Sequence, residues 1–226
     1  MEVVRITIGC GGLPTCSRCS VPSEQEHRLL ADVTADIESA VVTSVGRSGV
    51  ILLAGTEAFS HPSLPQIISA ATSAGARRIA VQTAGGLLGS GGNAQGVLHA
   101  GVRHFEIHYL PGDDAELAPG IPGALDGVAE LIRVSAAAGA RIALSAVITA
   151  CRHTIQHLSP AVGQLAAAGV GAVHIEVDPS AGTGPSATAS VLAACDTGVV
   201  NAVWVDVSGF ALPESHSMHF APEAAS

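Results

Sequence analysis

Residues 127–150 read GVAELIRVSAAAGARIALSAVITA, and this stretch decides the fold class of the chain. Its first half is amphipathic and rich in alanine, and it ends at Gly139. An aliphatic run with β-branched residues follows from Ile142 onward. Glycine closes helices in the left-handed conformation, and a short apolar run after such a turn is typical of a buried strand. The stretch therefore predicts one helix followed by one strand.

The same helix–glycine–strand pattern occurs six times along the chain. The glycines stand 26 to 38 residues apart, which is enough for one helix and one strand in each interval. With an opening strand at residues 3–8, they predict an α/β fold, a partial (β/α)6 TIM-like barrel with parallel strands. We expect residues 1–184 to form the core barrel, and residues 185–226 to add a helix and a strand that close it, plus a tail. The six glycines are Gly49, Gly75, Gly101, Gly139, Gly169 and Gly198.

The composition excludes several classes of function. The 226 residues carry a net charge of −9 and include no lysine, so neither a P-loop lysine nor a Schiff-base lysine exists. The acidic balance and the scattered arginines argue against nucleic acid as a partner. No uncharged apolar run is long enough for a membrane span. Glu2 stands where a signal peptide has its basic region, which predicts a cytoplasmic protein with reduced thiols.

Residues of chemical interest follow the first three predicted strands. In a parallel β/α barrel, the reactive residues lie in the loops that follow the strands. Because these loops meet at one end of the barrel, we expect their side chains to share one rim. The residues are Cys10, Cys16, Cys19, Gly55, Thr56, Glu57, Thr83, Ala84 and Gly85.

Cys10, Cys16 and Cys19 form a Cx5Cx2C motif in a glycine-rich loop. Three thiolates can hold three irons of a [4Fe–4S] cubane and leave the fourth iron open, and glycines let the chain approach the cluster closely. Two alternatives stay open. One is a zinc ion completed by a histidine such as His27, since structural zinc takes four ligands; the other is cysteines without a metal. The motif favours an open-site iron–sulfur cluster.

From the first strand to about Gly184, the chain resembles the radical S-adenosylmethionine (SAM) superfamily. The cysteine motif is similar to that family's cluster motif. The segment Gly55-Thr56-Glu57 with the trailing His61-Pro62 resembles its Gly-Gly-Glu segment, and Thr83-Ala84-Gly85 resembles its Thr-Asn-Gly segment. Residues 120–126 resemble the stretch that opens the fourth helix of the family. The five-residue spacing within the cysteine motif departs from the family's commonest spacing of three.

The resemblance implies which residues hold the cofactors. The three cysteines would bind the [4Fe–4S] cluster, and its open iron would chelate the amino and carboxylate groups of SAM. The segment after the second strand would receive the SAM amino group, since an ammonium needs acceptors. Residues on the third and fourth strands would contact the adenosine. The implied cluster ligands are Cys10, Cys16 and Cys19, and the implied SAM-binding residues are Gly55, Thr56, Glu57, Thr83, Gly85 and His108.

The resemblance also implies an activity. Reductive cleavage of SAM would give a 5′-deoxyadenosyl radical, which abstracts hydrogen from a polar substrate, either a small molecule or a peptide. The electron would come from a flavodoxin or ferredoxin. The alternative is a protein of another class on the same barrel: a metal-dependent lyase or hydrolase, or a degenerate binding protein.

Two residues depart from the family pattern. The family often has an aromatic residue where this chain has Arg18, and it has asparagine where this chain has Ala84. Both differences affect the fit of the adenosine.

Two predicted strands carry ionisable residues in strict alternation with apolar ones. Because the apolar faces belong under the helices, the ionisable faces should point into the barrel, where unpaired groups would be costly. We predict that Glu106, His174 and Glu176 are the catalytic residues that face the substrate. A polar network that only closes the barrel and a second metal site are the alternatives. The residues expected to point inward are His104, Glu106, His108, His174, Glu176 and Asp178.

Overall fold

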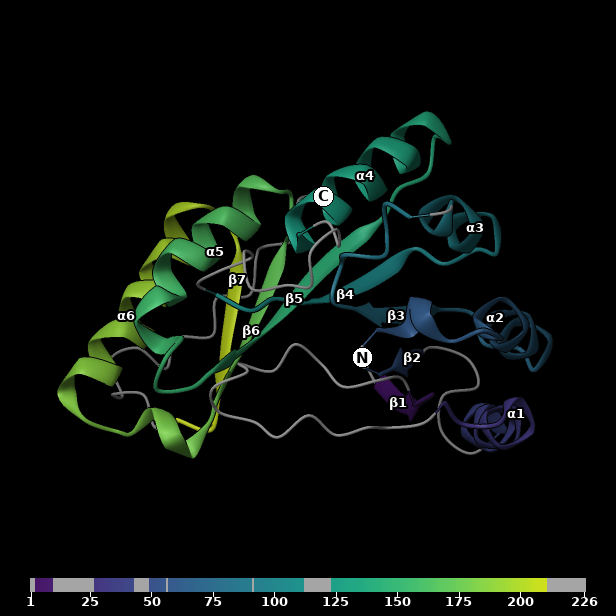
Figure 1. Ribbon diagram of the computed structural model, residues 1–226, viewed down its shortest axis with the longest axis horizontal. Coiled ribbons are helices and arrows are strands. Elements are labelled where there is room, and N and C mark those ends of the chain that lie inside the picture. Colours follow the sequence, from purple (N-terminus) through teal and green to yellow (C-terminus); the bar gives the residue numbers. More distant parts are fainter. Residues whose placement is uncertain are drawn as a thin grey trace.

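The computed structural model of the protein describes residues 3–9, 27–42, 49–55, 57–90, 92–111 and 123–210. Seven strands form one sheet in the order β1-β2-β3-β4-β5-β6-β7, and each neighbouring pair is parallel. The sheet curls into a half-barrel with the helices along its outer side (Figure 1). This confirms the predicted fold class, a partial TIM-like barrel of parallel strands.

Helices and strands alternate along the chain, with short 3-10 helices at three of the junctions in the described residues. Each parallel crossover therefore contains a helix, as parallel pairing requires. The elements are β1 (Val3–Thr7), α1 (Leu30–Ala40), β2 (Val50–Ala54), η2 (Ala58–Ser60), α2 (Leu64–Ser73), β3 (Ile79–Thr83), α3 (Asn93–His99), β4 (His104–His108), α4 (Ala124–Ala137), β5 (Ala143–Ala150), η4 (Ile155–His157), α5 (Leu158–Ala167), β6 (Ala172–Val177), η5 (Pro179–Ala181), α6 (Pro185–Val200) and β7 (Trp204–Ser208).

The hydrophobic core lies between the convex face of the sheet and the helices. Phe105 and Ile107 of β4 and Val173 and Ile175 of β6 all belong to it, and none is more than 1% exposed. The core is mostly aliphatic because aromatic residues make up only 3% of the chain. Within the described residues, no helix has both the length and the apolar character needed to cross a bilayer.

Four of the predicted helix-ending glycines do adopt the left-handed conformation. Gly75, Gly101, Gly139 and Gly169 have φ values between 62° and 100°, and each follows a helix. A residue with a Cβ is strained at such φ values. The glycine pattern therefore located these helix ends correctly.

The prediction for Gly198 was wrong, because α6 continues past it to Val200. The left-handed residue after this helix is Ala202, with φ 55°. Gly198 instead allows α6 to pack closely against β7, because a Cβ there would overlap the Cγ2 atom of Val205. A glycine that allows close helix–strand packing looks the same in the sequence as one that ends a helix.

The concave face of the sheet carries the alternate residues of each strand. Val50, Leu52 and Ala54 of β2 and Ala80 of β3 form a small apolar cluster there, separate from the main core. The concave residues of the later strands are mostly polar. The parallel register places them side by side: Gln82 pairs with Glu106 across β3 and β4, and His174 pairs with Asp206 across β6 and β7.

Candidate active site

The segment that carries the three cysteines begins and ends at the carboxyl end of β1. The backbone N–H of Arg28 donates to the carbonyl oxygen of Ile8 at 3.0 Å. The Nδ1 atom of His27 lies 3.1 Å from the carbonyl oxygen of Gly9, and because that oxygen can only accept, Nδ1 carries the proton. Residues 9 and 27, which flank this segment, therefore both lie at the carboxyl end of β1. The cysteines themselves lie outside the described residues.

A second histidine ties this point to the segment that follows β2. His61 is 4% exposed, and its Nδ1 atom accepts from the backbone N–H of Ser63 at 3.0 Å. Its Nε2 atom therefore carries the proton and donates to the carbonyl oxygen of Arg28 at 3.1 Å. The ring also meets His27 edge to face, with ring centroids 5.0 Å apart. His61, part of the predicted His-Pro motif, thus holds the base of the cysteine segment in place.

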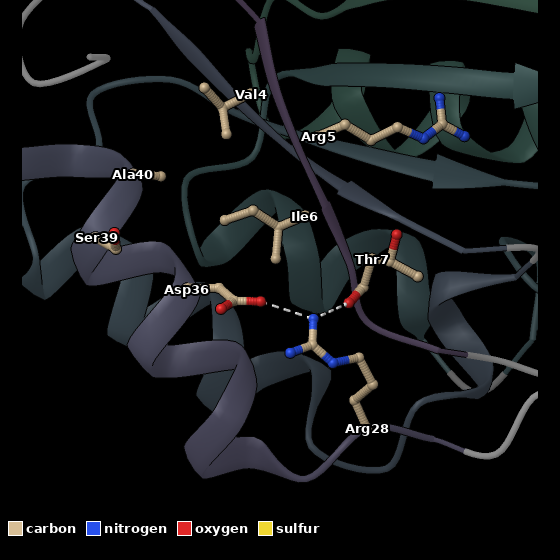
Figure 2. A pocket seen from close by; sticks show the side chains of 8 residues that line it. All are labelled: Val4, Arg5, Ile6, Thr7, Arg28, Asp36, Ser39 and Ala40. Carbon is tan, nitrogen blue, oxygen red and sulfur yellow. Dashed lines mark hydrogen bonds and ion pairs between the residues drawn. The ribbon is translucent and has the colours of Figure 1, made fainter. Parts of the chain in front are cut away.

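The Arg28 side chain fixes β1 to α1 (Figure 2). Its Nη1 atom lies 2.8 Å from both the carbonyl oxygen of Thr7 and the carboxylate of Asp36 on α1. A hollow of about 370 Å³ lies beside this contact, lined by β1 and α1. It contains none of the predicted site residues, and β1 is an edge strand of the sheet. We therefore place the candidate site at the strand ends and on the concave face instead.

Glu57 follows β2, and its carboxylate is surrounded by neutral donors. The Thr83 hydroxyl lies 2.7 and 2.9 Å from the two carboxylate oxygens. The backbone N–H groups of Phe59 and Ala84 donate to the same carboxylate at 3.1 and 3.2 Å. Burial raises the pKa of the Glu57 carboxyl, and the hydrogen bonds from Thr83, Phe59 and Ala84 offset only part of that effect. A partly buried carboxylate that has only neutral partners among the described residues is suited to bind a cation.

Thr83 and Gly85 support Glu57 from β3. Thr83 is fully buried, and its hydroxyl oxygen accepts from the backbone N–H of Gly85 at 2.9 Å while its proton points to Glu57. Gly85 has φ 89° and packs against the first turn of α4, where a Cβ would lie 2.8 Å from the carbonyl oxygen of Ala124. Glu57, Thr83 and Gly85, three of the residues predicted at the second and third strand ends, therefore form one hydrogen-bonded group.

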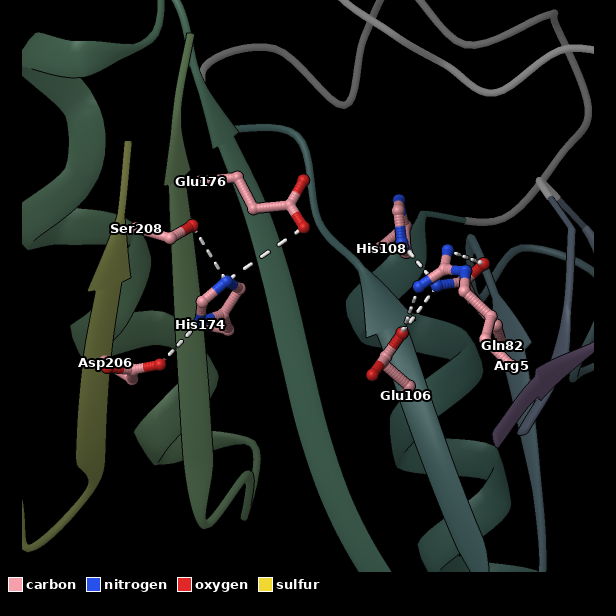
Figure 3. Close-up of polar contacts among 8 residues, drawn as sticks. All are labelled: Arg5, Gln82, Glu106, His108, His174, Glu176, Asp206 and Ser208. Carbon is pink, nitrogen blue, oxygen red and sulfur yellow. Dashed lines mark hydrogen bonds and ion pairs between the residues drawn. The ribbon is translucent and has the colours of Figure 1, made fainter. Parts of the chain in front are cut away.

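Gln82 connects four strands on the concave face (Figure 3). Its Oε1 atom accepts from Arg5 at 2.9 Å and from the backbone N–H of Gly55 at 3.2 Å. Its Nε2 atom donates to the Glu106 carboxylate and lies 2.7 Å from the Nε2 atom of His108. Both lone pairs and both protons of the amide are thus used. Gln82 orients Glu106 and His108, two of the predicted site residues.

His108 is held neutral by this environment. Burial lowers the pKa of its imidazole from 6.5 to about 4, and the nearby Arg5 guanidinium acts in the same direction. Because the neutral ring accepts a hydrogen bond from Gln82 at Nε2, its own proton resides on Nδ1. His108 therefore offers one N–H donor to a bound molecule near neutral pH and adds no charge to the concave face.

The stability of the protein is expected to fall between pH 6.5 and pH 4 because of His108. The unfolded chain binds a proton at this residue below pH 6.5, whereas the folded chain does so only near pH 4, so acid favours unfolding in this window. The full shift corresponds to about 3 kcal/mol in the free energy of unfolding. Urea unfolding of wild type and His108→Gln at several pH values measures it.

The His108→Gln variant is expected to lose most of this slope, and His99→Gln serves as the matched control because His99 is exposed on α3. An unchanged slope in His108→Gln would show that the imidazole titrates normally in the folded protein.

A second polar cluster lies across β6 and β7 (Figure 3). The Nδ1 atom of His174 is 3.0 Å from the carboxylate of Asp206, and its Nε2 atom is 3.1 Å from the hydroxyl of Ser208. The carboxylate of Glu176 lies 4.0 Å from the same Nε2 atom. His174 therefore lies among three other polar side chains, which come from two adjacent strands.

The concave orientation predicted from alternation holds for most of the residues concerned. On β4 and β6 the apolar residues are buried in the core under the helices, and their ionisable neighbours occupy the opposite face. Asp178 does not join them, because β6 ends at Val177 and the Asp178 carboxylate accepts from the backbone N–H of Ser180 at 2.8 Å, capping η5. His104 lies on the same face of β4, between Ala80 and Ala143. Thr56, like the cysteines, lies outside the described residues.

Sequence reasoning missed four residues of the site: Arg5, Gln82, Asp206 and Ser208. The available signal was alternation, since Asp206 and Ser208 are separated by Val207, and Gln82 directly follows three apolar residues of β3. Their roles depend on partners in neighbouring strands, which alternation does not identify. The roles assigned to Glu106, His174 and Glu176 as catalytic residues stay predictions.

The fold and the strand-end residues define a partial parallel barrel with a partly buried carboxylate at the strand ends, where the cysteine-bearing segment also begins and ends. No known family model matches the sequence, and neither does any curated protein sequence. Solved structures do share the fold. SuiB from Streptococcus suis, solved with bound S-adenosylmethionine, is similar with a TM-score of 0.62 and 11% identity, over 97% of this chain and 51% of SuiB.

Two further structures are similar to the same extent in sequence. The structure of native anSMEcpe with bound AdoMet gives a TM-score of 0.59 at 11% identity, over 92% of this chain and 63% of that protein. HMG-CoA lyase from Brucella melitensis gives 0.55 at 11% identity, over 91% of this chain and 79% of the lyase. The chain spans about half the length of SuiB, which was also solved bound to the precursor peptide SuiA. These similarities establish a shared fold.

Proposed function

We propose that the protein is a radical SAM enzyme, which binds a [4Fe–4S] cluster through Cys10, Cys16 and Cys19 and cleaves SAM reductively. The observation that carries the proposal is the position of Glu57. Its partly buried carboxylate lies at the carboxyl ends of the strands, where the cysteine segment also begins and ends, and His61 connects that segment to the residues after β2. Two solved structures of the same fold contain SAM.

The chemistry of Glu57 fits the SAM amino group. A partly buried carboxylate with a raised pKa gains from an ammonium partner, because the cation removes part of the penalty that burial places on the charged form. Thr83 and the N–H group of Ala84 hold the carboxylate in place, so its orientation exists before the ligand binds. Gly55 and Thr56 stand next to it in the chain and are assigned to the same amino group.

The remaining SAM contacts are assigned to the third and fourth strand ends. Thr83 and Gly85 at the end of β3 are assigned to the adenosine, and neutral His108 offers a donor to a ribose hydroxyl. Bound SAM, once reduced through the cluster, supplies a 5′-deoxyadenosyl radical for hydrogen abstraction. The protein positions the cofactor and shields the radical. A flavodoxin or ferredoxin is the proposed electron donor.

The concave face is the proposed substrate site. Glu106, His174 and Glu176 lie on it, and all three are at least partly accessible. These carboxylate and imidazole groups favour a polar substrate, either a small molecule or a peptide. The peptide bound to SuiB supports the second choice for this fold.

Replacing Glu57 by glutamine is expected to weaken SAM binding by about 10- to 100-fold, the usual worth of a hydrogen bond to a charged group. Isothermal titration of SAM into the anaerobically reconstituted protein measures the affinity. Glu38→Gln is the matched control, because Glu38 is exposed on α1. Equal SAM affinity in Glu57→Gln, with the cluster spectrum retained, would remove Glu57 from the SAM site.

A metal-dependent lyase is the second candidate, favoured by the similarity to HMG-CoA lyase over 79% of that protein. Anaerobic reconstitution with iron and sulfide distinguishes the two candidates. The radical SAM proposal requires about four irons and four sulfides per chain and formation of 5′-deoxyadenosine with dithionite. The lyase alternative requires neither.

A further inference from the structure

We propose that Ser208, His174 and Asp206 form a second reactive site, a nucleophile–base–carboxylate group for acyl transfer to water. The proposal goes beyond the radical chemistry and does not depend on it. The three side chains have the roles and spacings of a serine nucleophile, its general base and the carboxylate that orients the base. Such groups are recognised by geometry rather than by sequence order.

The strand register creates this arrangement. His174 of β6 and Asp206 of β7 are directly paired across the parallel ladder, and Ser208 is two residues further along β7, next to Glu176. Residues two apart in a strand point to the same face. The His174 ring therefore lies between Asp206 and Ser208, with heavy-atom distances of 3.0 and 3.1 Å (Figure 3).

The hydrogen bonds also select the reactive tautomer. An ionised carboxylate can only accept, so Asp206 requires the proton of neutral His174 to lie on Nδ1. The Nε2 atom then presents its lone pair to the Ser208 hydroxyl, which becomes the donor. This is the tautomer that a general base needs to remove a proton from a serine. The carboxylate of Glu176, 4.0 Å from Nε2, stabilises the imidazolium formed in that step.

The group is accessible and lies where parallel barrels place their chemistry. The side chains of His174 and Asp206 are 35% and 60% exposed. Ser208 is the last residue of β7, at the carboxyl end of the strands, where catalytic residues of such barrels are found. Ser208 is exposed, so within the described residues an ester can reach its hydroxyl oxygen.

The reaction balances with water as the co-reactant. The Ser208 oxygen forms a bond to the acyl carbon while its proton passes to Nε2 of His174. The bond between the acyl carbon and the leaving alcohol breaks, and the alcohol departs with that proton. Water, deprotonated by the same nitrogen, then releases the acid and regenerates the serine. No oxidant or reductant is involved.

A fluorophosphonate probe tests the nucleophile without knowledge of the natural ester. The full-length protein is incubated with the probe with and without reconstituted cluster, and peptide mass spectrometry quantifies labelling at each serine. We expect labelling of Ser208 in both states. His174→Gln is expected to lower the labelling rate at least about 100-fold, and Asp206→Asn to lower it strongly, because the wrong tautomer is then favoured.

Ser145→Ala is the matched control, since Ser145 lies on the same concave face and its hydroxyl is 3.4 Å from the carbonyl oxygen of Phe105. Labelling of Ser208 should be unchanged in this variant. Thermal unfolding of each variant verifies that it is folded. The proposal is overturned if folded wild type is not labelled at Ser208, or if His174→Gln is labelled as fast as wild type. Either result leaves the radical SAM proposal intact, because the probe needs neither iron nor SAM.

Discussion

Replacing Cys16 by alanine is expected to abolish cluster retention and SAM cleavage together. Three thiolates are the minimum that holds a cubane with one open iron, so the loss of one leaves two irons without protein ligands. After anaerobic reconstitution and desalting, wild type should retain about four irons per chain and the variant almost none. Formation of 5′-deoxyadenosine with dithionite, followed by chromatography, should fall to the background of cluster-free protein.

Cys195→Ala is the matched control, because it makes the same chemical change away from the strand ends. Cys195 lies in α6, and burial raises the pKa of its thiol, so it stays protonated and is a poor metal ligand. Full iron content in this variant, beside loss in Cys16→Ala, assigns the cluster to the predicted motif. Wild type that retains zinc but no iron and sulfide after reconstitution would instead support the zinc alternative.

Replacing Gly127 of α4 by alanine is expected to destabilise the fold strongly. A Cβ on Gly127 would overlap the carbonyl oxygen of Gly85, which is main chain and cannot move aside as a side chain does. Overpacking of this kind costs about 3 kcal/mol, or some 2–4 °C in Tm per kcal/mol for a chain of this size. Urea and thermal unfolding measure the loss.

Gly163→Ala provides the comparison, because Gly163 lies inside α5 with its nearest neighbour atom 3.8 Å from the added methyl group. Alanine favours helix formation over glycine, so this variant is expected to be as stable as wild type or up to about 1 kcal/mol more stable. Equal stability of the two variants would mean that α4 and the Gly85 backbone are not in contact in solution.

The Gly127 contact also links the fold to the site. Gly85 donates its N–H to Thr83, and Thr83 holds the Glu57 carboxylate. A shift of the Gly85 backbone is therefore expected to disturb Glu57, and SAM affinity should fall in any Gly127→Ala protein that remains folded.

Local patterns were sufficient for the fold class and for the faces of the strands. Alternation placed Glu106 and His174 opposite the core, because a one-residue slip would bury ionisable groups under aliphatic helices. The glycines at four helix ends were correctly interpreted because left-handed φ is a property of the residue itself. Gly198 was misinterpreted because its role depends on Val205, which follows it in the chain but faces it only after β7 forms.

The sequence by itself determined the alternation of helices and strands, the parallel half-barrel and the residues available at the strand ends. Only the tertiary structure decided which of them meet. The register of the parallel strands brings Gln82 to its four hydrogen-bond partners, and it places His174 between Asp206 and Ser208. The physical reason is separation along the chain. Helix ends and strand faces depend on neighbouring residues, whereas hydrogen-bond partners 24 to 77 residues apart are set by how the whole sheet pairs.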